Sequence, residues 1–338
     1  MKNMSRIGIA VIGCGRIGTT HIESILELND IAFLAAVVDD NIDIAERAAK
    51  KYNCNFYDKI EEALADPSVD AVVVCLPNDL HAPVSMTALE AGKHTLVEKP
   101  FALSFKDAEQ MVNLAHHSGL IVMCAQSYRF LPDLQEAQKR IKSEIGEPFS
   151  MLYACALNFD KNKAPAWWKF EKKTGGPVIQ FLGPHIIDAT LWFFEGKIPE
   201  YVYAQAASFN PDFEGPDEAT ILIKFRDGAM ATNYLSINTR PMLQECLITG
   251  PKGRIYYKQG DPSEGQVGTS SIELYIGEKR ITCDSKKNNN IKNEEENFIR
   301  SILKTAEPFV KTTDTLLQMK IIEAAKKSMN NRRAVEII

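Results

Sequence analysis

The sequence predicts an α/β protein that begins with a doubly wound parallel sheet and continues into a second α/β domain. Short apolar runs alternate with helical patterns over residues 1–125, which is typical of repeated strand–helix–strand units. From residue 126 onwards the strands become longer and hairpin signals appear. The length of 338 residues suits about two domains. We therefore expect one domain at 1–125 and another at 126–338.

The expected strands of the first domain are apolar throughout, as in strands buried on both faces of a parallel sheet. They cover residues 7–12, 32–38, 54–57, 71–75, 94–97 and 120–124. Between them, apolar residues recur at helical spacing. The expected helices cover residues 16–28, 42–52, 60–64, 81–91 and 105–117.

Composition excludes several classes of protein. The net charge of -5 provides no basic field that would attract nucleic acid or an anionic membrane surface. No apolar run approaches the ~20 residues that span a bilayer, and the N-terminal apolar stretch reads as a strand rather than a signal peptide. The seven cysteines are widely spaced and lack metal-site spacing. We expect a cytoplasmic protein with free thiols and no metal.

A G-x-G-x-x-G pattern follows the first expected strand and opens the first expected helix. In this context the pattern predicts a dinucleotide site, rather than a glycine turn without a nucleotide. Gly13 permits a tight turn, Gly15 lets a pyrophosphate approach the backbone, and Gly18 lets the helix pack closely on the strand. The helix N-terminus would face the phosphates. The expected contacts also include Arg16 and Ile17.

Asp39 indicates which dinucleotide is bound. It ends the second expected strand, 21 residues after Gly18, and a carboxylate at this spacing accepts hydrogen bonds from the ribose hydroxyls. It would repel a 2′-phosphate, and Asp40 adds to the repulsion. No Lys or Arg follows until Arg47. The sequence therefore favours NAD over NADP.

Ligands of open parallel sheets bind beyond the carboxyl ends of the strands, where the strand order reverses. Three segments leave strand ends in this way, at residues 75–78, 98–100 and 126–129. We expect further cofactor contacts from Leu76, Pro77, Asn78, His81, Glu98, Lys99 and Gln126.

At these motifs the chain resembles the Gfo/Idh/MocA family of NAD(P)-dependent oxidoreductases. Besides the glycine turn, the resemblance rests on Pro77-Asn78-Asp79-Leu80-His81, Ala88-Leu89-Glu90-Ala91-Gly92-Lys93-His94, Glu98-Lys99-Pro100, Gly175-Gly176 and Gly183-Pro184-His185 with Asp188. The resemblance implies an N-terminal Rossmann domain and a C-terminal α/β domain with a large, mostly antiparallel sheet. The open face of that sheet would form a homo-dimer or homo-tetramer.

The second half agrees with this expectation. Residues 226–228 and 250–253 read as turns that join pairs of strands, at 219–225 with 229–237 and at 243–249 with 254–257. Helices are expected at 186–194, 297–304 and 316–329, and a last strand at 334–338. The polar stretch 285–296 reads as a solvated loop.

The resemblance implies that Lys99 and His185 are the catalytic residues. Lys99 would hydrogen-bond the substrate hydroxyl and favour loss of its proton, and His185 would act as general acid and base. One departure concerns Phe181, which stands where many relatives have an Asp four residues before this His. That change argues against an inositol-dehydrogenase-like activity in particular.

Together these residues predict an enzyme that transfers a hydride between NAD(H) and a secondary alcohol or ketone of a sugar, cyclitol or sugar derivative. One alternative is an NAD-dependent glycosidase that uses transient oxidation and elimination. The other is a non-catalytic nucleotide- or sugar-binding regulator, favoured only by Phe181. The expected substrate contacts are Lys99, Tyr128, Arg129, Asn158, Trp168, His185 and Asp188.

Overall fold

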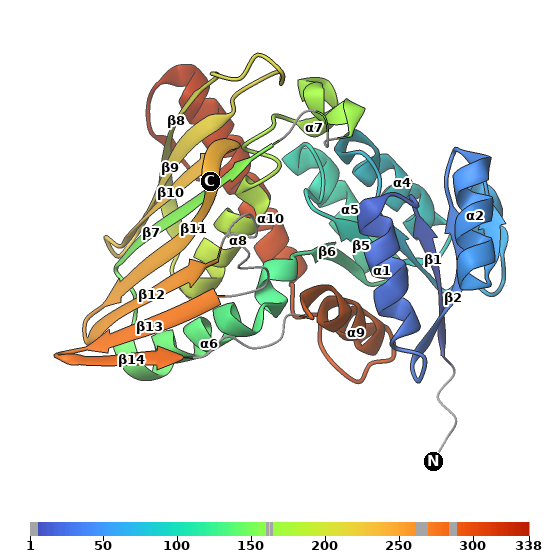
Figure 1. Ribbon diagram of the computed structural model, residues 1–338, viewed down its shortest axis with the longest axis horizontal. Coiled ribbons are helices and arrows are strands. Elements are labelled where there is room, and N and C mark those ends of the chain that lie inside the picture. The colour runs from blue at the N-terminus through green and yellow to red at the C-terminus, as the bar shows by residue number, and fades with distance from the viewer. Residues whose placement is uncertain (1–5, 160–161, 163–164, 261–269, 284–288, 338) are drawn as a thin grey trace. The chain divides into compact units, whose positions relative to one another are not determined.

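The computed structural model describes residues 6–159, 162, 165–260, 270–283 and 289–337 (Figure 1). Contacts between Cα atoms divide the chain into two compact units. The first unit runs to Ser127 and adds Asn289–Leu316, and the second comprises Tyr128–Asn288 and Leu317–Ile338. Residues 285–288 of the expected loop and residue 338 of the expected last strand lie outside the described residues.

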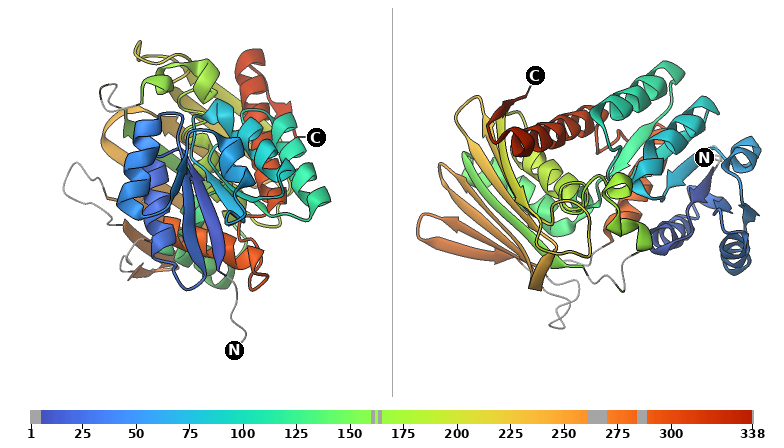
Figure 2. Two further views of the ribbon diagram at one scale, coloured as in Figure 1. Left: turned by 90° about the vertical axis from the view of Figure 1, so that its right-hand side faces the viewer. Right: turned by 90° about the horizontal axis from the view of Figure 1, so that it is seen from above.

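The first unit contains a parallel sheet of six strands, as predicted. Its order is β3-β2-β1-β4-β5-β6, so the order reverses on either side of β1. The strands are β1 (Ile7–Ile12), β2 (Ala32–Val38), β3 (Asn55–Tyr57), β4 (Ala71–Val74), β5 (His94–Glu98) and β6 (Val122–Ala125). Most of their residues are buried, because helices lie on both faces of the sheet (Figure 2).

The first five helices of the first unit match the predicted positions within a few residues at their ends, whereas the sixth begins seven residues before its predicted start at residue 297. They are α1 (Arg16–Leu26), α2 (Ile42–Tyr52), α3 (Ile60–Ala65), α4 (Asn78–Glu90), α5 (Phe105–Ser118) and α9 (Asn290–Ile302). Helix α4 begins three residues earlier than predicted. Pro77 is its N-cap, and the Pro77 carbonyl accepts a hydrogen bond from the Leu80 N–H, which closes a first turn that the apolar pattern did not indicate.

The expectation of a solvated loop over residues 285–296 was wrong for its second half. Helix α9 already begins at Asn290, and the side chains of Glu294 and Glu295 are fully buried. Helix α9 packs against α1 (Figure 1), where Glu295 finds a partner in His21. The acidic run suggested a solvated loop because the sequence does not show that Glu295 has a buried partner 274 positions away.

The second unit is built on a mostly antiparallel sheet of nine strands in the order β14-β13-β12-β11-β7-β10-β9-β8-β15. Among the strands that the structure describes in this sheet, β7 and β10 pair in parallel and the other neighbours pair antiparallel. The strands are β7 (Ser150–Asn158), β8 (Pro199–Ala207), β9 (Glu218–Phe225), β10 (Met230–Ser236), β11 (Asn238–Gly250), β12 (Gly253–Gln259), β13 (Ser270–Ile276), β14 (Lys279–Cys283) and β15 (Val335–Glu336). This confirms the predicted fold class.

Helices cover one face of this sheet. They include α6 (Pro132–Arg140), α8 (Gly183–Phe193) and α10 (Thr312–Asn331), and the short α7 (Glu171–Thr174) precedes α8 in the chain (Figures 1 and 2). The strand registers place five exposed side chains on one face of the sheet: Leu152, Tyr201, Tyr203, Met230 and Tyr234. Asn233 on the opposite face of β10 bonds to Thr190 of α8, so the five lie on the face without helices. Within the described ranges, none of the helices combines the length and the apolar character needed to cross a membrane.

The close packing of α1 on the first strand gives a prediction. A Cβ on Gly18 would lie 1.9 Å from the carbonyl oxygen of Gly13. Such overpacking costs about 1–3 kcal/mol, so Gly18→Ala should lower the free energy of unfolding by at least that amount in urea titrations. The control is Gly15→Ala, because a Cβ at Gly15 meets nothing within 4 Å. Equal stability of the two variants would contradict the packing.

Candidate active site

The glycine turn has the geometry that each of its glycines was predicted to provide. Gly13 has a φ of +96°, and a Cβ there would lie 2.3 Å from the carbonyl oxygen of Cys75. Gly15 is the N-cap of α1, and the space around its Cβ position is open. A helix N-terminus that offers free N–H groups beside open space is a site for an anion. These residues therefore fit the pyrophosphate of a dinucleotide.

Asp39 follows the end of β2 and supports the glycine turn from the side. Its Oδ2 accepts a hydrogen bond of 2.9 Å from the Cys14 N–H, and its Oδ1 accepts one of 3.1 Å from the Asn41 N–H. Burial, with the nearby Asp39 carboxylate, raises the pKa of the Cys14 thiol to about 12. The thiol therefore stays neutral, and Asp39 is the negative group beside the turn.

The segment after β4 is held by a buried histidine. Nδ1 of His81 lies 2.6 Å from the Pro100 carbonyl oxygen, and Nε2 lies 2.8 Å from the Leu76 carbonyl oxygen. Burial lowers the pKa of His81 against the opposing effect of the two carbonyls. The ring thus bridges the segment after β4 to the segment after β5. Asn78 is buried at the start of α4, while Leu76 and Pro77 are half-buried.

Lys99 follows the last residue of β5, and its backbone is fixed by Glu98. The Lys99 N–H donates a hydrogen bond of 2.9 Å to Oε2 of Glu98. The other oxygen of Glu98 lies 3.3 Å from Nε2 of His21, whose Nδ1 lies 2.6 Å from Oε1 of Glu295. The sequence did not identify His21 or Glu295 as site residues. A histidine on the otherwise apolar side of α1 was the one signal that pointed to a buried partner.

Gln126 follows β6, at the edge of the sheet where the carboxyl ends of the parallel strands meet. It is fully buried, and neither polar atom of its side chain has a hydrogen-bond partner among the described residues. A buried amide without a partner is costly, since it loses its hydrogen bonds to water. Its position at this edge and its unsatisfied polar atoms fit an amide that hydrogen-bonds to a ligand. Residues from β1, β2, β4, β5 and β6 thus gather at one edge of the sheet.

In the second unit, His185 lies in the first turn of α8 and stacks on Tyr128. The ring centroids are 4.2 Å apart and the planes differ by 9°. The hydroxyl of Tyr128 donates a hydrogen bond of 3.2 Å to Oε1 of Gln244. Burial raises the pKa of Tyr128 well above its usual value, so the phenol stays protonated. The stacked ring orients the imidazole of His185.

Arg129 and Asp188 were expected to contact the substrate, and the structure pairs them with each other. Nε and Nη2 of Arg129 each donate a hydrogen bond of 2.8 Å to the carboxylate of Asp188. Arg129 is 3% exposed and Asp188 is 0% exposed. Such a bidentate pair is geometrically specific. It ties the segment that carries Tyr128 to the helix that carries His185.

The aromatic residues before α8 form a cluster. The ring of Phe181 packs against Phe159 at 4.5 Å and against Trp168 at 4.6 Å between centroids, and Trp167 contacts Trp168. All four rings are half-buried, whereas Asn158 at the end of β7 is exposed. Phe181 is therefore part of a cluster of aromatic rings.

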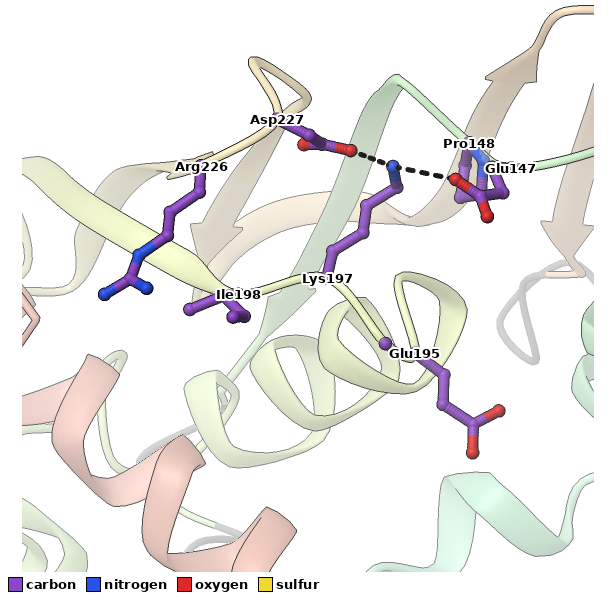
Figure 3. A pocket seen from close by; sticks show the side chains of 8 residues that line it. Glu147, Pro148, Glu195, Lys197, Ile198, Arg226 and Asp227 are labelled. Atoms are coloured by element: carbon purple, nitrogen blue, oxygen red, sulfur yellow. Dashed lines mark hydrogen bonds and ion pairs between the residues drawn. The ribbon is translucent and has the colours of Figure 1, made fainter.

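A separate pocket of about 290 Å³ lies elsewhere on the second unit, and none of the predicted site residues lines it. Figure 3 shows Lys197 at its centre, paired with Asp227 and, at 3.7 Å, with Glu147. The lysine charge is already balanced by these carboxylates. Among the described residues, no group of three or more His, Cys, Asp or Glu side chains could hold a metal ion.

Comparison with protein families decides the assignment. A family model described as an oxidoreductase family with an NAD-binding Rossmann fold matches residues 7–126, and its C-terminal alpha/beta domain matches residues 138–337. The chain belongs to the Gfo/Idh/MocA oxidoreductase family. It is an oxidoreductase with NAD as its cofactor, as predicted.

Named relatives and solved structures match from about two thirds to nearly all of the chain. The myo-inositol 2-dehydrogenase of Thermotoga maritima is 25% identical, over 97% of this chain and 98% of its own length. The 4-carboxy-2-hydroxymuconate-6-semialdehyde dehydrogenase of a Sphingobium species is 32% identical over 68% of this chain and 72% of its own. The WlbA dehydrogenase of Bordetella pertussis, solved with NADH and UDP-GlcNAcA, shares the fold, with a TM-score of 0.84, 22% identity and 99% of each chain covered.

The open space at Gly15 gives a prediction about cofactor affinity. In Gly15→Ala, the added methyl group would occupy the space in which we expect the pyrophosphate of NAD to approach the backbone. The variant should therefore keep its stability, yet bind NADH at least about tenfold more weakly, a difference of about 1.4 kcal/mol. Titration of protein fluorescence with NADH measures the change. Unchanged affinity would mean that the turn does not cradle the phosphates.

The pair in the second unit gives a prediction about stability. Asp188→Ala leaves the guanidinium of Arg129 buried without its carboxylate, which costs about 3–5 kcal/mol. The control is Glu195→Ala, which breaks the solvent-exposed pair with Lys142 and should cost less than about 1 kcal/mol. Urea unfolding of both variants checks this. An Asp188→Ala variant as stable as the control would show that Asp188 is not held by Arg129.

Proposed function

We propose that the protein transfers a hydride between NAD(H) and a secondary alcohol or ketone of a sugar, cyclitol or sugar derivative. The observation that carries the proposal is the placement of Lys99. It follows β5 at the same sheet edge as the glycine turn, with its backbone N–H bonded to Glu98. Lys99 therefore puts a positive charge at the sheet edge that is proposed to bind the dinucleotide. Relatives named as inositol and D-glucoside dehydrogenases support this substrate class.

In this proposal two side chains act on the substrate hydroxyl, and NAD, when bound, would supply the acceptor for the hydride. The ammonium of Lys99 donates a hydrogen bond to the substrate oxygen and lowers the cost of its negative charge. The imidazole of His185 takes the hydroxyl proton and returns it in the reverse reaction. The C–H bond breaks with its electron pair, and the carbonyl double bond forms.

We propose cofactor contacts for Gly13, Gly15, Arg16, Ile17, Gly18, Asp39, Leu76, Pro77, Asn78, His81, Glu98, Lys99 and Gln126. Asn158, Trp168 and Tyr128 would contact the sugar, since an aromatic face packs well on the apolar face of a sugar ring. Arg129 and Asp188 would serve the substrate by holding Tyr128 and His185 in place, because each is already bonded to the other.

We further propose that copies of the chain assemble through the helix-free face of the second sheet, as a homo-dimer or homo-tetramer. Leu152 on β7 and Tyr203 on β8 are 55% and 42% exposed on this face. Apolar side chains in that number on one sheet face suit an interface. We place the protein in the cytoplasm, because all seven cysteines are free thiols. Domains at 1–125 and 126–338 remain the proposed organisation.

The test is a screen of myo-inositol, glucose, methyl glucosides and levoglucosan with NAD and with NADP, followed by absorbance of the reduced cofactor. We expect net reduction of NAD by at least one compound. Cleavage of an aryl glycoside without net reduction would replace the dehydrogenase with an NAD-dependent glycosidase. Binding of NAD without any turnover would favour a regulator.

Lys99→Ala should lower kcat by at least about a hundredfold, since a positioned charge on a developing oxyanion contributes that much. The affinity for NADH should stay within about twofold, because the glycine turn and Asp39 are unchanged. Lys106→Ala, which removes an exposed lysine seven positions along the chain, is the control and should be fully active. Full activity of Lys99→Ala would remove Lys99 from the mechanism.

A further inference from the structure

Three ionisable side chains meet inside the first unit, beneath the segment that carries Lys99. His21 comes from α1, Glu98 from the end of β5 and Glu295 from α9. The side chains of His21 and Glu295 are fully buried, and that of Glu98 is 13% exposed. Nε2 of His21 lies 3.3 Å from Oε1 of Glu98, and Nδ1 lies 2.6 Å from Oε1 of Glu295.

This arrangement makes His21 a cation. Each of its ring nitrogens faces a carboxylate oxygen, which accepts but does not donate, and the two negative charges favour the ring with a proton on both nitrogens. Burial alone would lower the pKa of His21, but the hydrogen bonds and charges of Glu295 and Glu98 raise it to about 10. Burial, with the charges of the same two carboxylates and of Glu294, raises the pKa of the Cys75 thiol well above its usual value, so the thiol stays neutral.

Glu98 connects this cation to Lys99. One carboxylate oxygen faces His21 and the other accepts the Lys99 N–H at 2.9 Å. A carboxylate bound at both oxygens cannot rotate without losing one of the two bonds. On the far side of Lys99, the Pro100 carbonyl lies against His81. The backbone of Lys99 is therefore held before and after the residue.

We propose that His21 and Glu295 are positioning residues for Lys99, acting through Glu98. His21 fixes the carboxylate that holds the Lys99 backbone, and Glu295 keeps the His21 ring charged and oriented. Helix α9, from the far end of the sequence, thereby supports the active site from outside the nucleotide-binding segments. The effect on turnover rests on the proposed function, whereas the effect on the Lys99 backbone does not.

The main test is the double variant His21→Gln/Glu295→Gln. It removes one cation and one carboxylate, so the cluster keeps its net charge and the variant is expected to fold. The control is Glu296→Gln on the same helix, whose carboxylate pairs with Arg300 at the surface. The first measurement needs no substrate. Hydrogen exchange of the Lys99 amide should become at least about tenfold faster in the double variant, as expected for a loosened hydrogen bond, and should not change in the control.

The second measurement uses the compound of the screen that the wild-type enzyme oxidises fastest. In the double variant kcat should fall by about tenfold or more, as expected when a catalytic group is misplaced, while KM for NAD stays within about twofold. Unchanged exchange at Lys99, or unchanged kcat, would overturn the positioning role. If the wild-type enzyme oxidises none of the compounds, the proposed function fails, and the exchange measurement still decides whether the cluster holds Lys99.

The single variant Glu295→Gln supplies a pH readout that a merely structural role would not move. Removing one of the two carboxylates that face His21 lowers the pKa of the ring, while Glu98 remains beside it. His21 then loses its proton at a lower pH than the value of about 10 in the wild-type protein. We expect kcat of the variant to decline at a lower pH than kcat of the wild-type enzyme. Superimposable pH profiles would overturn the role of Glu295.

Discussion

The candidate active site of the first unit depends on the ion pairs that the buried His21 forms with Glu98 and Glu295. Burying a charge costs several kcal/mol unless opposite charges and hydrogen bonds surround it. Here the cation is flanked by Glu98 and Glu295. Because these residues belong to α1, β5 and α9, the requirement to pair one charge holds three elements together. Two of these elements also adjoin the proposed cofactor site, since α1 begins at the glycine turn and β5 ends at Glu98, next to Lys99.

The second unit follows the same physical logic around His185. Arg129 and Asp188 are buried and form a bidentate ion pair. Loss of either charge would therefore leave the other unpaired in the low-dielectric interior. Tyr128 precedes Arg129 in the chain and stacks on His185, which precedes Asp188 by three residues in α8. Each proposed catalytic residue thus lies close in sequence to a member of a buried ion pair: Lys99 follows Glu98, and His185 comes three residues before Asp188. Charged residues without a proposed chemical role thus hold in place Lys99 and His185, the two proposed catalytic residues.

The sequence predicted the features that local pattern can encode. Strands buried on both faces read as apolar runs, and the glycine turn requires glycine at positions 13 and 18, where a Cβ would meet backbone atoms. It did not predict pairing over long sequence separation. Glu295 in an acidic run reads as solvated until His21, 274 positions away, is known to face it. Arg129 and Asp188 were recognised one by one, but hydrophobic periodicity contains no information about which charges meet.

The most direct test of this account is the protonation state of His21 in the folded protein. With 15N-labelled histidine, NMR can detect whether each ring nitrogen carries a proton between about pH 7 and 9, above the pKa of ~6.5 of an unperturbed histidine. We predict that both nitrogens of His21 stay protonated throughout this range. A neutral ring, with one nitrogen unprotonated at pH 8, would contradict the charged cluster and with it the proposed support of Lys99.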